Sequence, residues 1–434
     1  MDKIYIKGGK PLNGEINISG SKNAALPALA ATLLTADEVL IKNLPLLSDV
    51  ESMQNLLASH GALHHVIHGN AGLDSKERCL KISCAGINNF TAHYDLVRKM
   101  RASVLVLGPL LARFGEAYIS LPGGCAIGNR PVDIHINSLI KMGAQITIEN
   151  GYINAHCKGR LKGADILLPF PSVGATENIM MAATLAEGVS IIHNAAKEPE
   201  IEDLARLLKK MGAQISGEGS EIITIQGVDK LHGAEHSLIG DRIEAGTYII
   251  AAGITGGKLK INNIDHSLLG SLDLVDSPLF CFSKAGIEIE FNNDNSLTAS
   301  ISKIKAIELQ TAPFPLYATD LQAQIMSLLS LADGVSVITE NIFENRFMHV
   351  PELNRMGANI HLQNSHKTAI IHGVNHFKGA PVMATDLRAS VALVLAGLAA
   401  NGTTEVNRIY HLDRGYENLV EKLAACGAEI SRSN

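Results

Sequence analysis

The sequence predicts an α/β protein of two similar domains, each containing three copies of one repeated unit. Six segments of the 434-residue chain share a plan: a helix of small apolar residues, a strand, a polar turn, a second helix ending in Gly-Ala or a close variant, and short strands. The first helix is apolar nearly all round, so we expect it to be buried, whereas the second alternates apolar and charged residues. This pattern predicts buried, parallel helices surrounded by sheets.

The repeated units define the expected domain boundaries. The clearest copies begin at Glu177, Leu321 and Leu387, and the others begin near Asn23, Arg101 and Ile243. Each second helix is followed by a glycine that can adopt the left-handed conformation and end the helix: Gly61, Gly143, Gly212, Gly286, Gly357 and Gly427. The opening strand has no helix of its own. We therefore expect one domain over residues 21–240, and a second formed by residues 1–20 together with 241–434.

Composition excludes several classes of partner. The net charge is −6 with both signs interspersed, tryptophan is absent and aromatic residues make up 4%, which argues against nucleic acid as a ligand. The six cysteines are scattered, which favours a reducing compartment over a disulfide framework. The apolar runs are too short to span a bilayer, and the N-terminus has no signal-peptide pattern. We expect a cytoplasmic protein that neither binds nucleic acid nor inserts into a membrane.

The segment over residues 121–133 combines a thiol, a cation and a helix start. Cys125 lies among the glycines at 123, 124 and 128, where the backbone can approach a ligand closely. Arg130 offers a forked cation, and Pro131 suits the first position of the helix that follows. A helix N-terminus attracts anions, so this loop is a candidate anion site. The alternative is a glycine-rich hairpin with a buried cysteine.

Polar residues also recur where the other buried helices begin. Ser172 precedes one helix, while Asp320 and Asp386 are expected to be N-caps. Cations fall at equivalent ends of the units, at Lys22, Arg130, Arg346, Arg388 and Arg414. Such a set in an acidic protein needs an anionic ligand with about three charges. No P-loop or dinucleotide fingerprint follows a strand.

Three histidines, at positions 64, 65 and 68, fall in a polar stretch with nearby glycines. They could bind a metal ion, but histidines on a polar surface turn are usually solvated. We therefore expect no metal site.

Several motifs resemble the enolpyruvyl transferases over essentially the whole chain. They are ISGSKNAALPALAATLL, LPGGCAIGNRPVDIH, SVGAT, ATDLQAQ, ENRFMHVPEL, ATDLRAS and RIYHLDRGYE. The resemblance implies a two-domain inside-out α/β barrel of six repeated units. It is closest to the branch that transfers the enolpyruvyl group of phosphoenolpyruvate to the 3′-hydroxyl of UDP-N-acetylglucosamine. That reaction proceeds by addition and elimination through a tetrahedral ketal and releases phosphate. It is the first committed step of peptidoglycan synthesis, on which cell-wall growth, cell shape and division depend.

The resemblance also implies a role for particular residues, and no cofactor. Cys125 would protonate the phosphoenolpyruvate methylene and be the target of fosfomycin-type epoxides, and Asp320 would accept the proton of the sugar hydroxyl. The implied catalytic set is Cys125, Asp320, Lys22 and Arg414. Phosphoenolpyruvate would contact Lys22, Asn23, Arg130, Arg346, Arg388 and Arg414. UDP-N-acetylglucosamine would contact Asn23, Arg101, Arg130, Pro131, Val132, Asp133, Ile134, Ser172, Val173, Gly174, Asp320 and Ile342.

One position departs from the pattern of some relatives, and two other functions stay open. Phe170 stands just before the Ser-Val-Gly turn, where some relatives have a lysine near the diphosphate. The alternatives are a 3-phosphoshikimate 1-carboxyvinyltransferase and a non-catalytic paralogue that binds UDP-sugars. The Cys125 loop argues against the first alternative. The presence of both Cys125 and Asp320 argues against the second, because binding alone requires neither.

Overall fold

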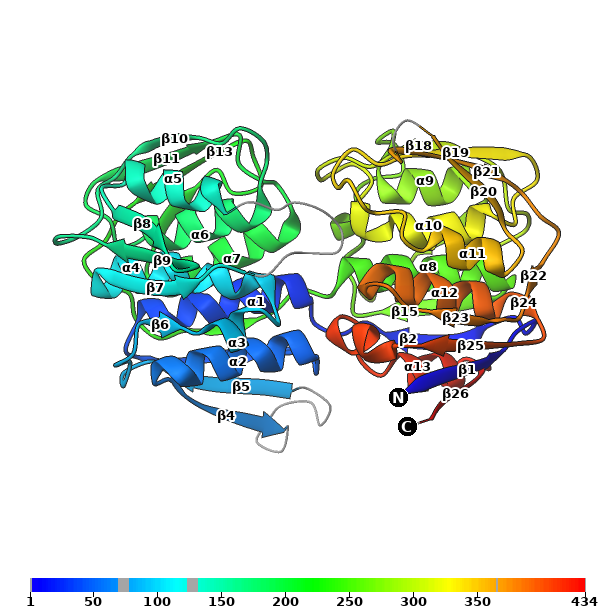
Figure 1. Ribbon diagram of the computed structural model, residues 1–434, viewed down its shortest axis with the longest axis horizontal. Helices are drawn as coiled ribbons and strands as arrows, with labels where there is room; N and C mark the ends of the chain where they lie inside the picture. The colour runs from blue at the N-terminus through cyan, green and yellow to red at the C-terminus, as the bar shows by residue number, and fades with distance from the viewer. Residues whose placement is uncertain (1, 69–77, 123–131, 364–365, 434) are drawn as a thin grey trace. The chain divides into compact units, whose positions relative to one another are not determined.

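The computed structural model describes residues 2–68, 78–122, 132–363 and 366–433, which form two compact units (Figure 1). Of the described residues, 20–68, 78–122 and 132–239 form the N-terminal unit, and 2–19, 240–363 and 366–433 form the C-terminal unit. The break between them therefore follows Ile239, where the third copy of the repeat ends. The first strand of the chain belongs to the C-terminal unit because it pairs with strands near the end of the sequence.

Three four-stranded sheets form in the described part of the N-terminal unit. Their strand orders are β14 (Glu235–Ser237)–β3 (Glu38–Lys42)–β5 (Arg78–Ser83)–β4 (Leu63–His68), β6 (Thr91–Ala92)–β7 (Glu116–Ser120)–β9 (Tyr152–His156)–β8 (Gln145–Glu149), and β10 (Asp165–Leu167)–β11 (Val189–His193)–β13 (Ile222–Gln226)–β12 (Gln214–Ser216). In each sheet the first pair is parallel and the next two are antiparallel.

The described residues of the C-terminal unit repeat this pairing. The four-stranded sheets are β2 (Asn13–Asn17)–β15 (Lys258–Asn262)–β17 (Ser296–Ile301)–β16 (Ile287–Phe291), β18 (Glu308–Gln310)–β19 (Val335–Thr339)–β21 (Thr368–His372)–β20 (Asn359–Gln363), and β23 (Pro381–Met383)–β25 (Thr403–Asn407)–β1 (Lys3–Lys7)–β26 (Glu429–Ser433). A short parallel pair, β22 (Phe377–Lys378) with β24 (Ala400–Asn401), accompanies them. The same one-parallel, two-antiparallel pattern recurs, so the repeat seen in the sequence is a repeat of strand pairing.

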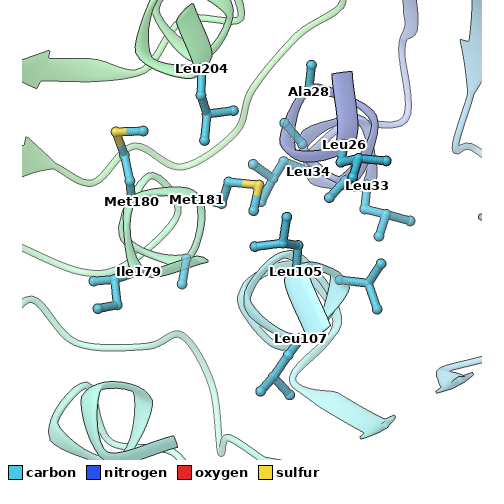
Figure 2. Close-up of a cluster of buried hydrophobic side chains, with 14 of the residues drawn as sticks. Leu26, Ala28, Leu33, Leu34, Leu105, Leu107, Ile179, Met180, Met181 and Leu204 are labelled. Atoms are coloured by element: carbon cyan, nitrogen blue, oxygen red, sulfur yellow. The ribbon is translucent and has the colours of Figure 1, made fainter. Parts of the chain in front are cut away.

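The small-residue helices are buried, as predicted. In the N-terminal unit these are α1 (Lys22–Ala31), η2 (Arg101–Val106) continuing into α4 (Leu107–Phe114), and α6 (Val173–Ala183); in the C-terminal unit they are α8 (Arg242–Thr255), α10 (Gln322–Leu329) and α12 (Leu387–Leu398). Within each unit these helices pack against one another. Figure 2 shows the result in the N-terminal unit, where Leu26, Leu105 and Met181 from three helices point toward a shared interior. Burying each such side chain contributes about 1.5–3 kcal/mol.

The second helices of the repeats are α2 (Ser48–His60), α5 (Asp133–Lys141), α7 (Pro199–Lys210), α9 (Pro278–Lys284), α11 (Val350–Arg355) and α13 (Leu419–Ala425). The remaining helical segments are η1 (Thr32–Leu34), α3 (Tyr94–Val97), η3 (His266–Leu269), η4 (Thr319–Leu321) and η5 (Ile409–Arg414). The glycine after each second helix has a positive φ, between 93° at Gly143 and 109° at Gly61, which confirms the predicted left-handed ends. Among the described helices, none is both long and apolar enough to cross a membrane.

Candidate functional site

Lys22 begins the buried helix α1 and has an acidic partner inside the same unit. Ser21 caps the helix by accepting a hydrogen bond from the Ala24 backbone N–H, at 3.3 Å. The Lys22 ammonium lies 3.3 Å from a carboxylate oxygen of Asp49, in the first turn of α2, and the two side chains are 12% and 6% exposed. The partner explains how a cation sits at a helix N-terminus, where positive charge is otherwise disfavoured. The sequence alone did not identify Asp49.

Three segments that were predicted to contact a sugar nucleotide are joined by one buried amide. Arg101 begins η2, Ser172 caps α6 through a 3.4 Å bond from the Ala175 N–H, and α5 begins at Asp133. Asn178 of α6 donates to the Val104 carbonyl of η2 at 3.1 Å and accepts from the Gly108 N–H of α4 at 2.7 Å. Its amide nitrogen also lies 3.0 Å from a ring nitrogen of buried His135 on α5. Asn178 thereby fixes these segments relative to one another.

The predicted sugar contacts around these segments differ in exposure. Val132 and Ile134 are buried and Asp133 is exposed, whereas Arg101, Ser172, Val173 and Gly174 are partly buried. Phe170, just before this turn, is 54% exposed.

Asp320 is not an N-cap, and this prediction was wrong. It lies in the middle of the one-turn 3₁₀ segment η4, and α10 starts only at Gln322, without a side-chain cap. Its carboxylate instead pairs with two guanidinium groups, those of Arg346 and Arg388; the Arg388 Nη2–Oδ2 distance is 2.9 Å. The arginine side chains are buried, while that of Asp320 is 29% exposed. Asp320 therefore has a partly exposed carboxylate that is held by two buried cations.

Arg388 belongs to a polar network among the three buried helices of the C-terminal unit. Burial alone would lower the pKa of Arg388, but the Asp320 carboxylate raises it strongly, so the guanidinium stays charged. The Tyr416 hydroxyl lies 3.4 Å from Arg388 Nη1, 2.9 Å from the Thr247 hydroxyl of α8 and 3.2 Å from the Gln324 amide nitrogen of α10. Gln324 also donates to the Asp320 backbone carbonyl at 2.8 Å. The network thus fixes both Arg388 and the turn that carries Asp320.

Glu340 organises the loop that contains Ile342, a predicted sugar contact. Its carboxylate is buried and accepts four hydrogen bonds, from the hydroxyls of Thr311 and Thr319 and from the backbone N–H groups of Ile342 and Phe343, at 2.8–3.1 Å. The side chain of Ile342 is left 37% exposed. The sequence analysis missed Glu340, Asn178 and Gln324. The available signal was that Asn178 and Gln324 are polar residues within helices that were predicted to be buried, and that Glu340 directly follows a strand.

One further predicted residue, Arg414, and two histidines complete the C-terminal set. Arg414 is partly buried at the end of η5, and burial together with Arg414 lowers the pKa of neighbouring His411. Burial lowers the pKa of His349, which lies beside Arg346, to about 4. His349 is thus neutral at physiological pH, and Met326 lies 3.2 Å from its ring nitrogen.

The remaining predictions fall outside the described residues or concern metal. Cys125, Arg130 and Pro131 belong to the segment that the structure does not describe. Asn23, in the first turn of α1, is partly buried. Among the described residues, no group of three or more histidine, cysteine, aspartate or glutamate side chains is arranged to hold a metal ion.

Comparison with known proteins identifies the family. The family model described as EPSP synthase (3-phosphoshikimate 1-carboxyvinyltransferase) matches residues 6–423. The chain belongs to the EPSP synthase family of enolpyruvyl transferases. Its curated relatives include proteins named UDP-N-acetylglucosamine 1-carboxyvinyltransferase from Granulibacter bethesdensis and Paramagnetospirillum magneticum. Both are 55% identical to this chain and match all of it, with 99% and 98% of the relatives covered.

Solved structures of enolpyruvyl transferases share the fold. The enolpyruvyl transferase NikO from Streptomyces tendae aligns with a TM-score of 0.86 at 24% identity, covering 100% of this chain and 99% of that one. EPSP synthase from Acinetobacter baumannii aligns with a TM-score of 0.73 at 18% identity over the full length of both chains. The predicted α/β class is confirmed. The closed inside-out barrel of six units stays a prediction.

Proposed function

We propose that this enolpyruvyl transferase transfers the enolpyruvyl group of phosphoenolpyruvate to the 3′-hydroxyl of UDP-N-acetylglucosamine and releases phosphate. The observation that carries the proposal is the 55% identity, over the whole chain, to relatives named for that activity. The reaction would commit UDP-N-acetylglucosamine to peptidoglycan synthesis in the cytoplasm. It requires no cofactor, because its chemistry consists of proton transfers, the addition of the sugar hydroxyl to phosphoenolpyruvate and the loss of phosphate.

In this proposal Asp320 is the general base that accepts the proton of the sugar hydroxyl. A carboxylate can do this without a metal when it lies within hydrogen-bond reach of the hydroxyl. The exposed edge of Asp320 leaves room for that contact, while Arg346 and Arg388 fix the direction in which the carboxylate points. The sugar oxygen then adds to C2 of phosphoenolpyruvate, whose methylene has been protonated, and forms a tetrahedral centre. Loss of a methyl proton and cleavage of the C–O bond to phosphate restore the enol and release phosphate.

The cations are proposed to hold the anionic groups of phosphoenolpyruvate. An arginine has five N–H donors, so pairing with Asp320 leaves donors of Arg346 and Arg388 for a phosphate or carboxylate. Within the described residues the Arg346 Nε is buried without a hydrogen-bond partner. Lys22, Arg414 and Arg130 would supply the remaining charge, and Asn23 would contact both substrates. Such preorganised cations stabilise negative charge that develops on the reacting centre.

The N-terminal unit is proposed to supply most of the sugar-nucleotide contacts. Ser172 caps α6, and Val173 and Gly174 begin its first turn, where backbone N–H groups suit a diphosphate. Arg101, residues 130–134 and Ile342 would complete these contacts. Phe170 has no charge to offer the diphosphate, so the backbone and Ser172 would bind it.

Cys125 is proposed as the acid that protonates the methylene carbon of phosphoenolpyruvate. A thiol with an ordinary pKa of about 8.5 is protonated at neutral pH and can donate to carbon when it is positioned. The same thiol would be alkylated by a fosfomycin-type epoxide. Incubating the protein with fosfomycin should add the mass of one inhibitor to the wild type and none to Cys125→Ala, as measured by intact mass spectrometry.

The decisive experiment measures phosphate release from phosphoenolpyruvate with UDP-N-acetylglucosamine, and separately with shikimate 3-phosphate. We expect release only with UDP-N-acetylglucosamine, together with an enolpyruvyl adduct of the nucleotide sugar in the mass spectrum. The purified Cys125→Ala protein serves as the control for contaminating phosphatase. Release with shikimate 3-phosphate would assign the sister activity. Binding of the nucleotide sugar without any release would make the protein a non-catalytic paralogue.

A further inference from the structure

Glu340 has the contacts of a structural clamp between two functional segments. Glu340 directly follows strand β19. Its four hydrogen-bond donors are not all near it in sequence, because Thr311 and Thr319 lie 29 and 21 residues away. Thr311 also accepts a hydrogen bond from the Asn341 N–H at 3.0 Å. One buried carboxylate therefore ties the end of β18, the η4 turn and the loop after β19 together.

Thr319 is the link between this clamp and Asp320. Its hydroxyl donates to Glu340 Oε2 at 2.9 Å, and it is the residue directly before Asp320 in the η4 turn. A second threonine in the chain has the same sequence context but no such acceptor. Thr385 precedes Asp386 within an identical Ala-Thr-Asp-Leu tetrapeptide, and its buried hydroxyl has no hydrogen-bond partner in the described residues. Of the two tetrapeptides, the one whose threonine hydroxyl contacts Glu340 is therefore also the one whose aspartate pairs with the arginines.

We propose that Glu340 is a positioning residue that holds the turn carrying Asp320 through Thr319 and sets the place of Ile342 through the loop backbone. This inference rests on the proposed function, in which Asp320 is the base and Ile342 contacts the sugar nucleotide. A carboxylate is the one side chain that can accept all four bonds without offering a proton in return. Displacing a catalytic group by about 1 Å costs up to about 100-fold in rate.

The test separates the two sets of hydrogen bonds that Glu340 makes, one through Thr319 to the Asp320 turn and the other to the backbone of the loop that contains Ile342. Thr319→Val removes only the hydroxyl that links Glu340 to the Asp320 turn, so we expect kcat to fall about 10-fold to 100-fold with little change in the KM for UDP-N-acetylglucosamine. Glu340→Gln keeps the shape of the side chain but places an N–H₂ group among donors, so the hydrogen bonds to the loop backbone should weaken too. We expect its KM for the nucleotide sugar to rise along with the loss of kcat.

Thr385→Val is the matched control, because it makes the same change at a hydroxyl that has no partner in the identical tetrapeptide. We expect its kcat to stay within about twofold of the wild type. If Thr319→Val loses no more kcat than Thr385→Val, or if Glu340→Gln leaves the KM unchanged, the positioning role is wrong.

Amide hydrogen exchange gives a readout that does not depend on turnover. The Ile342 and Phe343 amides should exchange faster in Glu340→Gln than in the wild type, whereas Thr319→Val should leave them protected. If the wild type has no transferase activity, the proposed function fails, and amide exchange still decides whether Glu340 holds this loop. Unchanged exchange in Glu340→Gln would overturn the inference.

Discussion

The tetrapeptide Ala-Thr-Asp-Leu occurs twice in this chain, at 318–321 and at 384–387, with two different structures. Asp386 is an N-cap of α12, accepting from the N–H groups of Arg388 at 2.8 Å and Ala389 at 3.1 Å. Asp320 caps nothing and directs its carboxylate to Arg346 and Arg388. The same four residues thus give a structural cap in one place and a candidate base in the other.

The difference arises from what surrounds each copy. Residues 311–317 separate β18 from the first copy, whereas β23 ends at Met383, directly before the second. The longer connection lets Thr319 bond to Glu340 and lets the chain enter α10 through a 3₁₀ turn. One feature is common to both. The side chain four residues after each aspartate, Gln324 or Ser390, donates to that aspartate's backbone carbonyl.

The largest expected contrast is between the two aspartates themselves. Asp320→Asn should lower kcat roughly 10²–10⁴-fold, because an amide cannot accept the proton of the sugar hydroxyl. Asp386→Asn keeps a good cap, so its melting temperature and kcat should change little. Turnover and thermal unfolding measured on both variants test the comparison. Equal turnover in the two variants would show that Asp320 is not the base.

Substitutions of the residues four positions after each aspartate should differ less in their effects than those of the aspartates, and the difference should appear in the free energy of unfolding. Gln324→Ala removes the bonds to Asp320, Thr247 and Tyr416 and leaves a cavity, so we expect a loss of about 2–4 kcal/mol of unfolding free energy. Ser390→Ala removes one local bond and should cost about 0.5 kcal/mol. Chemical denaturation of both proteins gives the comparison. A larger loss in Ser390→Ala than in Gln324→Ala would contradict it.

The smallest effect concerns pH and buried His349, which interacts electrostatically with Asp386 of the second copy and with Arg346, which pairs with Asp320 of the first. The pKa of His349 is lowered by burial to about 4, with Asp386 partly opposing the shift and Arg346 adding to it. Below its ordinary pKa of about 6.5, the unfolded chain binds a proton that the folded chain does not, so stability falls as pH drops from about 6.5 toward 4.

This component should amount to roughly 1–2 kcal/mol between pH 7 and pH 5. The variant His349→Phe cannot bind that proton, so its unfolding free energy should fall less over the same range. Denaturation midpoints at the two pH values provide the measurement. Parallel losses in variant and wild type would exclude His349 as the source.

The sequence by itself determined the features that depend on local pattern. The repeated units, the buried first helices, the left-handed glycines and the cap at Asp386 all follow from residues within one turn or one strand of each other. Local spacing also drew attention to Lys22, Arg346 and Arg388 as cations at the ends of the repeated units.

Only the tertiary structure decided what those side chains face. From its neighbouring residues, Asp320 is predicted to be a helix cap. Its partners lie 26 and 68 residues away, however, and the partner of Lys22 lies 27 residues away. No local pattern encodes such pairs, because packing of the buried helices brings their ends together. A charged group buried there must find an opposite charge, and this requirement outweighs the roughly 1 kcal/mol that a helix cap would contribute.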